Sequence, residues 1–176
     1  VMPCDYTPPI KSIGHGITCT ADLVSESEVR GVFLELSQDI GLKLRKQGLA
    51  ANGVRITVRD NTLSHRQYQC KLPFPTQSYL EIYDAGIDMF HRRYSWSNNI
   101  RSLTISAIDL ISADTPVQLD LWTDMSKHKR RIRLEETIED IRRRFGLHAI
   151  NFAAAGSMKI PVQSDIEYKM PSVMYQ

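Results

Sequence analysis

The side chains able to bind metals or carry out catalysis are scattered along this sequence. Its five histidines never fall at a metal-ligand spacing, and the HExxH pattern is absent. No GxSxG, P-loop or GxGxxG motif is present, and Gly14-His15-Gly16 alone indicates a close backbone approach rather than a phosphate cradle. A small-molecule enzyme needs convergent titratable groups, and the sequence offers no such set. We therefore expect a chain without catalytic residues, metal site or cofactor of its own.

The acidic pairs near the C-terminus are a second candidate for chemistry. Glu135-Glu136 and Glu139-Asp140 lie among arginines in a segment with helical periodicity. Carboxylates and arginines three or four residues apart on a helix form ion pairs. We expect a solvated, salt-bridged helix face here rather than a set of metal ligands.

One predicted sheet face has the composition of a surface that binds polyanions. Its residues are cations, hydroxyls, amides and glycines, with almost no carboxylates and no large apolar group. They are Ser12, Gly14, Gly16, Thr18, Arg55, Thr57, Arg59, His65, Gln67, Gln69, Lys71, Ser102, Thr104 and Ser106. Small side chains let main-chain N–H groups approach phosphates while Arg and Lys supply charge, which favours sequence-independent binding of a nucleic-acid backbone. No aromatic residue is placed to stack on a base as in an RNA-reading sheet; the alternative is a merely solvated face.

A short apolar island, Gln118-Leu119-Asp120-Leu121-Trp122, follows the stretch Ala113-Asp114-Thr115-Pro116. A short extended peptide can insert such side chains into a preformed pocket of a partner, with the Gln118 amide fixing the register. The spacing equally allows the island to fold back onto its own domain or to begin the next helix.

Hydrophobic periodicity predicts the elements that position these residues. Strands are expected over residues 11–20, 53–60 and 64–72, the last ended by Pro73 and Pro75, and a further strand follows Asn99. Ser25 and Glu28 have the spacing of a capping box, and Gly48 is a plausible stop for the helix that they open. A second helix is expected over about residues 77–94. The apolar stripe of the first helix comprises Val29, Val32, Phe33, Leu36, Ile40 and Leu44.

This order of elements predicts an α+β domain with a four-stranded, mostly antiparallel sheet and two helices on one face. The βαββαβ order is that of the ferredoxin-like, split βαβ fold, which leaves the other sheet face open. We expect a lead-in at residues 1–9, the domain at 10–112, a linker carrying the apolar island at 113–126, a basic helix at 127–146 and a tail at 147–176. The stripe of the basic helix comprises Leu134, Ile138, Ile141 and Phe145.

Composition narrows the class of protein further. The 176 residues, 42% of them hydrophobic, can bury one ordinary core, and a net charge of +2 does not by itself indicate nucleic acid. Cys4, Cys19 and Cys70 are far apart, which favours reduced thiols in the cytoplasm. No apolar run approaches the roughly 20 residues of a membrane span. The N-terminus lacks the features of a signal peptide, and its opening Val suggests a piece of a longer protein.

Several segments together resemble one family. They are Lys11-Ser12-Ile13-Gly14 with Thr18 and Asp22-Leu23, the run Leu44 to Leu49, Leu72-Pro73, the run Ile100 to Leu103, the island Gln118 to Trp122 and the run Ile141 to Gly146. This pattern, over roughly residues 10–150, resembles the C-terminal little-finger domain of Y-family DNA polymerases, the DNA polymerase IV and UmuC-like enzymes of lesion bypass.

The resemblance implies a non-catalytic domain that grips the template-primer backbone during DNA repair. The implied DNA contacts are Lys11, Ser12, Gly14, His15, Thr18, Arg55, Arg59, Gln67, Gln69, Lys71, Arg101, Ser102 and Thr104. The implied contacts with a bacterial sliding clamp are Gln118, Leu119, Leu121 and Trp122. Nucleotidyl transfer, with its Mg²⁺, would belong to the parent polymerase, and the domain itself is expected to be a monomer. The alternative function is a ferredoxin-like protein-interaction domain with no role on DNA.

Overall fold

The computed structural model describes residues 9–116, 125–146 and 149–152. The apolar island at residues 118–122 lies outside these ranges. Seven elements follow in the order β1 (Ser12–Leu23), α1 (Glu26–Lys46), β2 (Leu49–Asp60), β3 (His65–Thr76), α2 (Tyr79–Arg93), β4 (Ile100–Ser112) and α3 (Met125–Phe145). None of the helices within the described residues is long and apolar enough to span a membrane.

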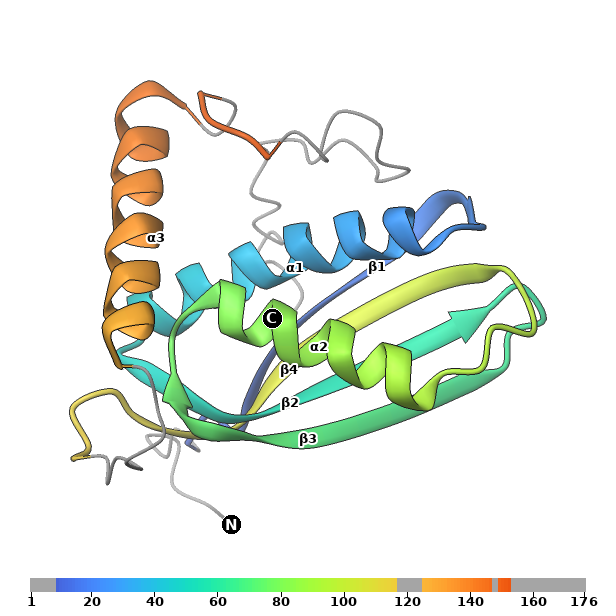
Figure 1. The fold of residues 1–176 in the computed structure, drawn as a ribbon, viewed down its shortest axis with the longest axis horizontal. Helices are drawn as coiled ribbons and strands as arrows, with labels where there is room; N and C mark the ends of the chain where they lie inside the picture. The colour runs from blue at the N-terminus through green and yellow to red at the C-terminus, as the bar shows by residue number, and fades with distance from the viewer. Residues whose placement is uncertain (1–8, 117–124, 147–148, 153–176) are drawn as a thin grey trace, which may run out of the picture.

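The four strands form one sheet in the order β1-β4-β2-β3, and every neighbouring pair is antiparallel. β4 lies between β1 and β2, which α1 connects, and β2 lies between β3 and β4, which α2 connects. The sheet therefore consists of two interlocked split βαβ units, with α1 and α2 on one face (Figure 1). The predicted α+β class, with two helices on one face of an antiparallel sheet, is confirmed.

Alternation in the strands and the stripe of α1 build the core as predicted. All six stripe residues of α1 are buried, and they pack with inward residues of the sheet such as Val54, Ile56 and Leu103. The capping box is present: Glu28 N–H donates to Ser25 Oγ, and the Glu28 carboxylate accepts from the N–H of Ser25. Gly48 follows α1 with a φ of +62°, a left-handed conformation that favours glycine.

The third strand corrects one prediction, because β3 passes through Pro73 and Pro75 instead of ending before them. It is an edge strand, and its register against β2 jumps from Lys71 opposite Gly53 to Thr76 opposite Ala51. The four residues between Lys71 and Thr76 therefore bulge away from regular pairing. Proline lacks the N–H that a ladder needs, and edge strands and bulges are the places in a sheet where it is tolerated.

The third helix lies across the end of the helix layer, close to the C-terminus of α1 and the N-terminus of α2 (Figure 1). Its apolar stripe is buried only in part, because Ile138 is buried whereas Leu134 and Phe145 are exposed. The residues of α3 buried against the domain are Ile138 and Glu135, and the Glu135 side chain is fully buried. The prediction of a solvated acidic face is therefore wrong for Glu135, which is buried.

The Glu135 carboxylate accepts hydrogen bonds from the N-terminus of α2. The donors are Ser78 Oγ at 2.5 Å and the backbone N–H groups of Tyr79 at 3.1 Å and Leu80 at 3.2 Å. Arg45, in the last turn of α1, adds an ion pair at 2.9 Å and also pairs with Glu139. These contacts compensate the buried charge, because a carboxylate at a helix N-terminus meets unpaired N–H groups and the positive end of the helix dipole.

Candidate nucleic-acid interface

The face of the sheet away from α1 and α2 is built from four rows of residues that cross all four strands. In the order β1, β4, β2, β3, the rows are Ser12, Ile108, Gly53 and Lys71; Gly14, Ser106, Arg55 and Gln69; Gly16, Thr104, Thr57 and Gln67; and Thr18, Ser102, Arg59 and His65. We call these sixteen positions the open face. All fourteen residues that strand alternation predicted for this surface lie on it.

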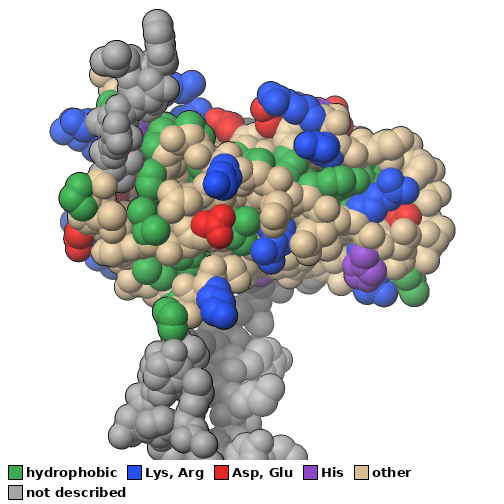
Figure 2. All heavy atoms as spheres, turned by 90° about the horizontal axis from the view of Figure 1, so that it is seen from below, with side chains coloured by type: hydrophobic (Ala, Val, Ile, Leu, Met, Phe, Trp, Pro, Cys, Tyr) green, Lys and Arg blue, Asp and Glu red, His purple; other side chains and the backbone are tan. Residues whose placement is uncertain are grey.

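The open face contains no carboxylate, and cations and hydroxyls stand side by side. Seen from below, this side of the molecule is mostly uncharged and polar, with scattered Lys and Arg side chains and few Asp or Glu (Figure 2). Arg55 lies in the second row and Arg59 in the fourth, both on the central strand β2. Within the described residues neither arginine has an ion-pair partner, and the Nε atom of each is buried without a hydrogen-bond partner. An anion docked on this face would offset that unpaired charge.

The two glycines of β1 are explained by the neighbouring strand. A Cβ atom at Gly16 would overlap the hydroxyl of Thr104 and lie 3.0 Å from its Cβ, and one at Gly14 would overlap the hydroxyl of Ser106. The close approach expected at these glycines is therefore made by β4. The glycines leave room for hydroxyl groups that lean over β1 and line the open face.

His15 lies on the opposite side of the sheet from the other residues implied for β1. Because Gly14 and Gly16 face outward, alternation directs His15 toward α1, where its Nδ1 lies 2.9 Å from Asp39 Oδ2. Burial alone would raise the pKa of Asp39, but His15 and Lys43 hold that pKa below its ordinary value. His15 therefore does not lie on the same surface as Ser12 and Thr18. We correct the implied set by placing His15 on the helix side of the sheet.

Arg101 lies in an irregularity of β4 that strict alternation does not describe. Arg59 is opposite Ser102 and Asp60 is opposite Ile100, so Arg101 has no partner on β2. One extra residue on one strand is a β-bulge, which bends the strand and re-aims side chains. The Arg101 side chain is exposed and pairs with Asp22 near the end of β1, at 3.1 Å.

Ile108 belongs to the open face although it was not among the predicted residues. It stands between Ser12 and Gly53 and is buried. The alternation of Ser102, Thr104 and Ser106 along β4 was the signal that could have placed it. The row containing Ile108 is consequently less polar than the other three. Lys11, also in the implied set, is exposed just before β1 begins.

The residues implied to bind a clamp, Gln118, Leu119, Leu121 and Trp122, lie outside the described residues. They fall between the end of β4 at Ser112 and the start of α3 at Met125. Within the described part of the chain, no group of three or more His, Cys, Asp or Glu side chains is placed to hold a metal ion.

Residues 10–121 match the impB/mucB/samB family C-terminal domain. The chain belongs to this family. It is 32% identical over 146 residues to DNA polymerase IV of Acetivibrio thermocellus, covering 83% of the chain and 37% of that polymerase. It is 28% identical over 150 residues to DNA polymerase IV of Pelotomaculum thermopropionicum, covering 85% of the chain and 36% of the relative. The predicted membership of the Y-family polymerases, as their little-finger domain, is confirmed.

The chain is also similar to a third polymerase and to one solved structure. DNA polymerase IV 2 of Bacillus subtilis is 30% identical over 149 residues, covering 82% of the chain and 35% of the relative. A solved structure described as a complex of beta-clamp processivity factor and little finger domain of PolIV has a TM-score of 0.48 and 14% identity, over 64% of this chain and 99% of that one. The chain spans little more than a third of the length of the polymerases that it matches.

Proposed function

We propose that this little-finger domain holds the sugar–phosphate backbone of template-primer DNA on its open face, without sequence preference. The observation that carries the proposal is a sheet surface of sixteen positions with no carboxylate and with two unpaired arginines on its central strand β2. Such a surface attracts phosphates, because nothing on it repels them and each arginine can release a counterion from the DNA on binding.

The hydroxyl groups define how the backbone is held. Ser102, Thr104 and Ser106 follow one another on the central strand β4, and Thr57 stands beside Thr104 on β2. Hydroxyl contacts to phosphate fix the register and orientation of a protein on DNA but read no bases. The face also lacks aromatic side chains for stacking, so it fits a backbone rather than unstacked bases.

The test is the salt dependence of binding to a primed duplex, measured by fluorescence anisotropy. Arg55→Gln with Arg59→Gln should lower the affinity and reduce the slope of log K against log salt by about 2, one for each lost phosphate contact. The matched control is Arg92→Gln with Arg93→Gln, which removes the same charge from α2 on the other layer. An unchanged slope in the Arg55/Arg59 variant would overturn the proposal.

We propose further that the island Gln118 to Trp122 binds a bacterial sliding clamp. The support is its sequence, two leucines and a large aromatic residue after a glutamine, in the connection between β4 and α3. Aliphatic and aromatic anchors of this kind fill preformed pockets on partner proteins. Leu121→Ala with Trp122→Ala should abolish binding to an immobilised clamp, whereas Asp114→Ala, an exposed change in the same connection, should have no effect. Equal clamp affinity for all three proteins would show that the island is not a tether.

We assign polymerisation, with its Mg²⁺-dependent nucleotidyl transfer, to the parent polymerase. The support is that the matched DNA polymerase IV relatives are nearly three times as long as the aligned region, which covers 37% of one and 36% of another. Two-metal transfer needs clustered carboxylates. The domain would add grip and tethering to a repair polymerase. A direct check is primer extension with the 176-residue chain alone, for which we expect no nucleotide incorporation.

A further inference from the structure

The first half of α3 departs from a rule that the other helices follow. α1 and α2 have acidic residues in their first turns, Glu26 and Glu28 in α1 and Glu81 in α2, and basic residues in their last turns. This arrangement complements the helix dipole. α3 has basic residues in its last turn but no acidic residue in its first. Instead, five cations and no carboxylate stand between Lys127 and Arg133.

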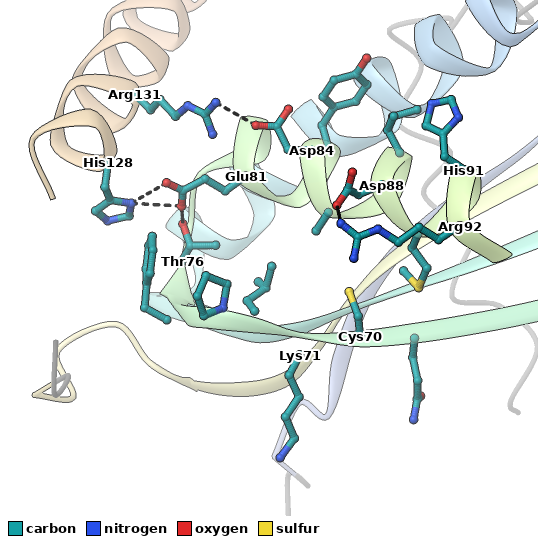
Figure 3. Close-up of a pocket in the computed structure, with 18 of the residues that line it drawn as sticks. Cys70, Lys71, Thr76, Glu81, Asp84, Asp88, His91, Arg92, His128 and Arg131 are labelled. Atoms are coloured by element: carbon teal, nitrogen blue, oxygen red, sulfur yellow. Dashed lines mark hydrogen bonds and ion pairs between the residues drawn. The ribbon is translucent and has the colours of Figure 1, made fainter. Parts of the chain in front are cut away.

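The side chains of this segment lie on two sides of the helix. His128 and Arg131 point toward α2, where His128 Nδ1 lies 2.9 Å from Glu81 and Arg131 lies 2.8 Å from Asp84 (Figure 3). Glu135 follows on the same inner side, at the N-terminus of α2. With about 100° between successive residues of a helix, Lys129, Arg130 and Arg133 lie on the opposite side. We call these three residues the outer flank.

The outer flank is exposed and carries three positive charges. Within the described residues, Lys129, Arg130 and Arg133 have no ion-pair partner. Two of their spacings, 129 to 133 and 130 to 133, place like charges next to each other on the helix surface, which disfavours the helix. Residues that disfavour their own helix and form no ion pair within the fold mark a functional surface.

We infer that the outer flank of α3 is a second binding surface for nucleic-acid phosphates, separate from the open face. Three cations on a fixed helix can neutralise successive phosphates without reading bases. The exposed large apolar side chain next to the outer flank is Leu134, and one leucine is less than the cluster of anchors that a protein partner needs. The ion pairs of the inner side hold α3 on the helix layer (Figure 3), so the cations are presented from a fixed position.

This surface would contact a different stretch of backbone from the open face. α3 lies at the end of the helix layer, whereas the open face is on the other side of the sheet (Figure 1). The inference therefore goes beyond the proposed function and does not depend on it. The nucleic acid that reaches both surfaces must extend past the edge of the domain.

The experiment compares two triple variants of the 176-residue chain on a primed duplex with a long single-stranded template overhang. Lys129→Gln, Arg130→Gln and Arg133→Gln should weaken binding at least tenfold and reduce the slope of log K against log salt by about 3. The control, Lys46→Gln, Arg143→Gln and Arg144→Gln, removes the same charge from the last turns of α1 and α3. It should leave the affinity within about twofold of the unmodified chain.

A thermal melt separates a binding role from a structural one. Removing the outer-flank cations relieves their mutual repulsion, so the thermal midpoint should stay the same or rise while DNA affinity falls. Unchanged affinity and salt slope in the outer-flank variant would overturn the inference. An equal loss of DNA affinity in the control variant would also overturn it, because the binding would then respond to net charge alone. Arg55 and Arg59 are intact in both variants, so a failure of this inference can be distinguished from a failure of the proposal for the open face.

Discussion

Asp60 ends β2 and orders the turn into β3. Its Oδ1 atom accepts hydrogen bonds from Thr62 Oγ1 at 2.7 Å and from the N–H groups of Thr62 and Ser64 at 2.9 Å, and its Oδ2 accepts from Asn98 at 3.1 Å. These bonds, led by the Thr62 hydroxyl, lower the pKa of Asp60 from 3.8 to about 2. The carboxylate therefore ties the β2–β3 turn to the loop before β4.

The lowered pKa of Asp60 predicts an acid-dependent loss of stability. The folded chain favours the ionised carboxylate more strongly than the unfolded chain does. The contribution of Asp60 to the free energy of unfolding is therefore present above pH 3.8 and is lost as the pH falls toward about 2. Asp60→Asn should be less stable than the unmodified chain at pH 7, and the difference should shrink across this window. Urea unfolding of both proteins at several pH values measures it; a difference that does not vary with pH would contradict the prediction.

A side chain at position 16 should destabilise the fold. Gly16→Ala should cost about 1–3 kcal/mol, the usual range for overpacking, because the new Cβ meets the Thr104 side chain. In a chain that already carries Thr104→Gly, the Gly16→Ala substitution should cost much less stability than it does in the unmodified chain. A double-mutant cycle of urea unfolding gives the coupling, and a coupling near zero would mean that the two residues do not constrain each other.

Among the elements, α3 shows that a helix can be docked mainly by polar contacts. Burial raises the pKa of Glu135, and its bonds with Ser78, Leu80, Tyr79 and Arg45 act in the opposite direction by stabilising the charged form. The carboxylate joins three helices at one point, because it lies on α3, caps α2 and pairs with the end of α1. Ile138 is the buried apolar contact beside it.

Glu135→Ala should weaken the docking of α3 by about 1–3 kcal/mol, the cost of leaving buried hydrogen-bond donors unpaired. The first N–H groups of α2 would lose their acceptor, whereas Arg45 would keep its ion pair with Glu139. Hydrogen exchange of α3 amides should accelerate more than that of the strands. The adjacent Glu136 is exposed, so Glu136→Ala should change stability by no more than about 0.5 kcal/mol. Equal exchange in both variants would show that Glu135 does not hold the helix.

For the whole molecule, the main hydrophobic core is complete without α3. The buried cluster runs from Ile13 to Ala107 and draws on β1, β2, β4, α1 and α2, with partly buried residues of β3 packed against it. A chain of residues 9–116 should therefore fold cooperatively, with a lower thermal midpoint because the N-terminus of α2 loses Glu135. Calorimetry and far-ultraviolet circular dichroism would check this expectation; a truncated chain without a cooperative transition would show that α3 belongs to the folding unit.

Sequence patterns were sufficient for the element order, the capping box of α1 and fourteen of the sixteen positions of the open face. It succeeded there because each decision depends on neighbours within one element. It was less successful at element ends: β3 continues through two prolines, and Arg101 sits in a bulge. Both exceptions arise from pairing between strands, which local patterns do not report.

The sequence by itself determined that one sheet face would be rich in cations and hydroxyls, since alternation fixes which side chains share a face. Only the tertiary structure decided which residues became neighbours. It placed Ser106 and Thr104 over the glycines of β1, turned His15 toward Asp39, and buried Glu135 on α2. Strand order and helix docking come from contacts between residues far apart in the chain, so the spacing of residues along any one element cannot reveal them.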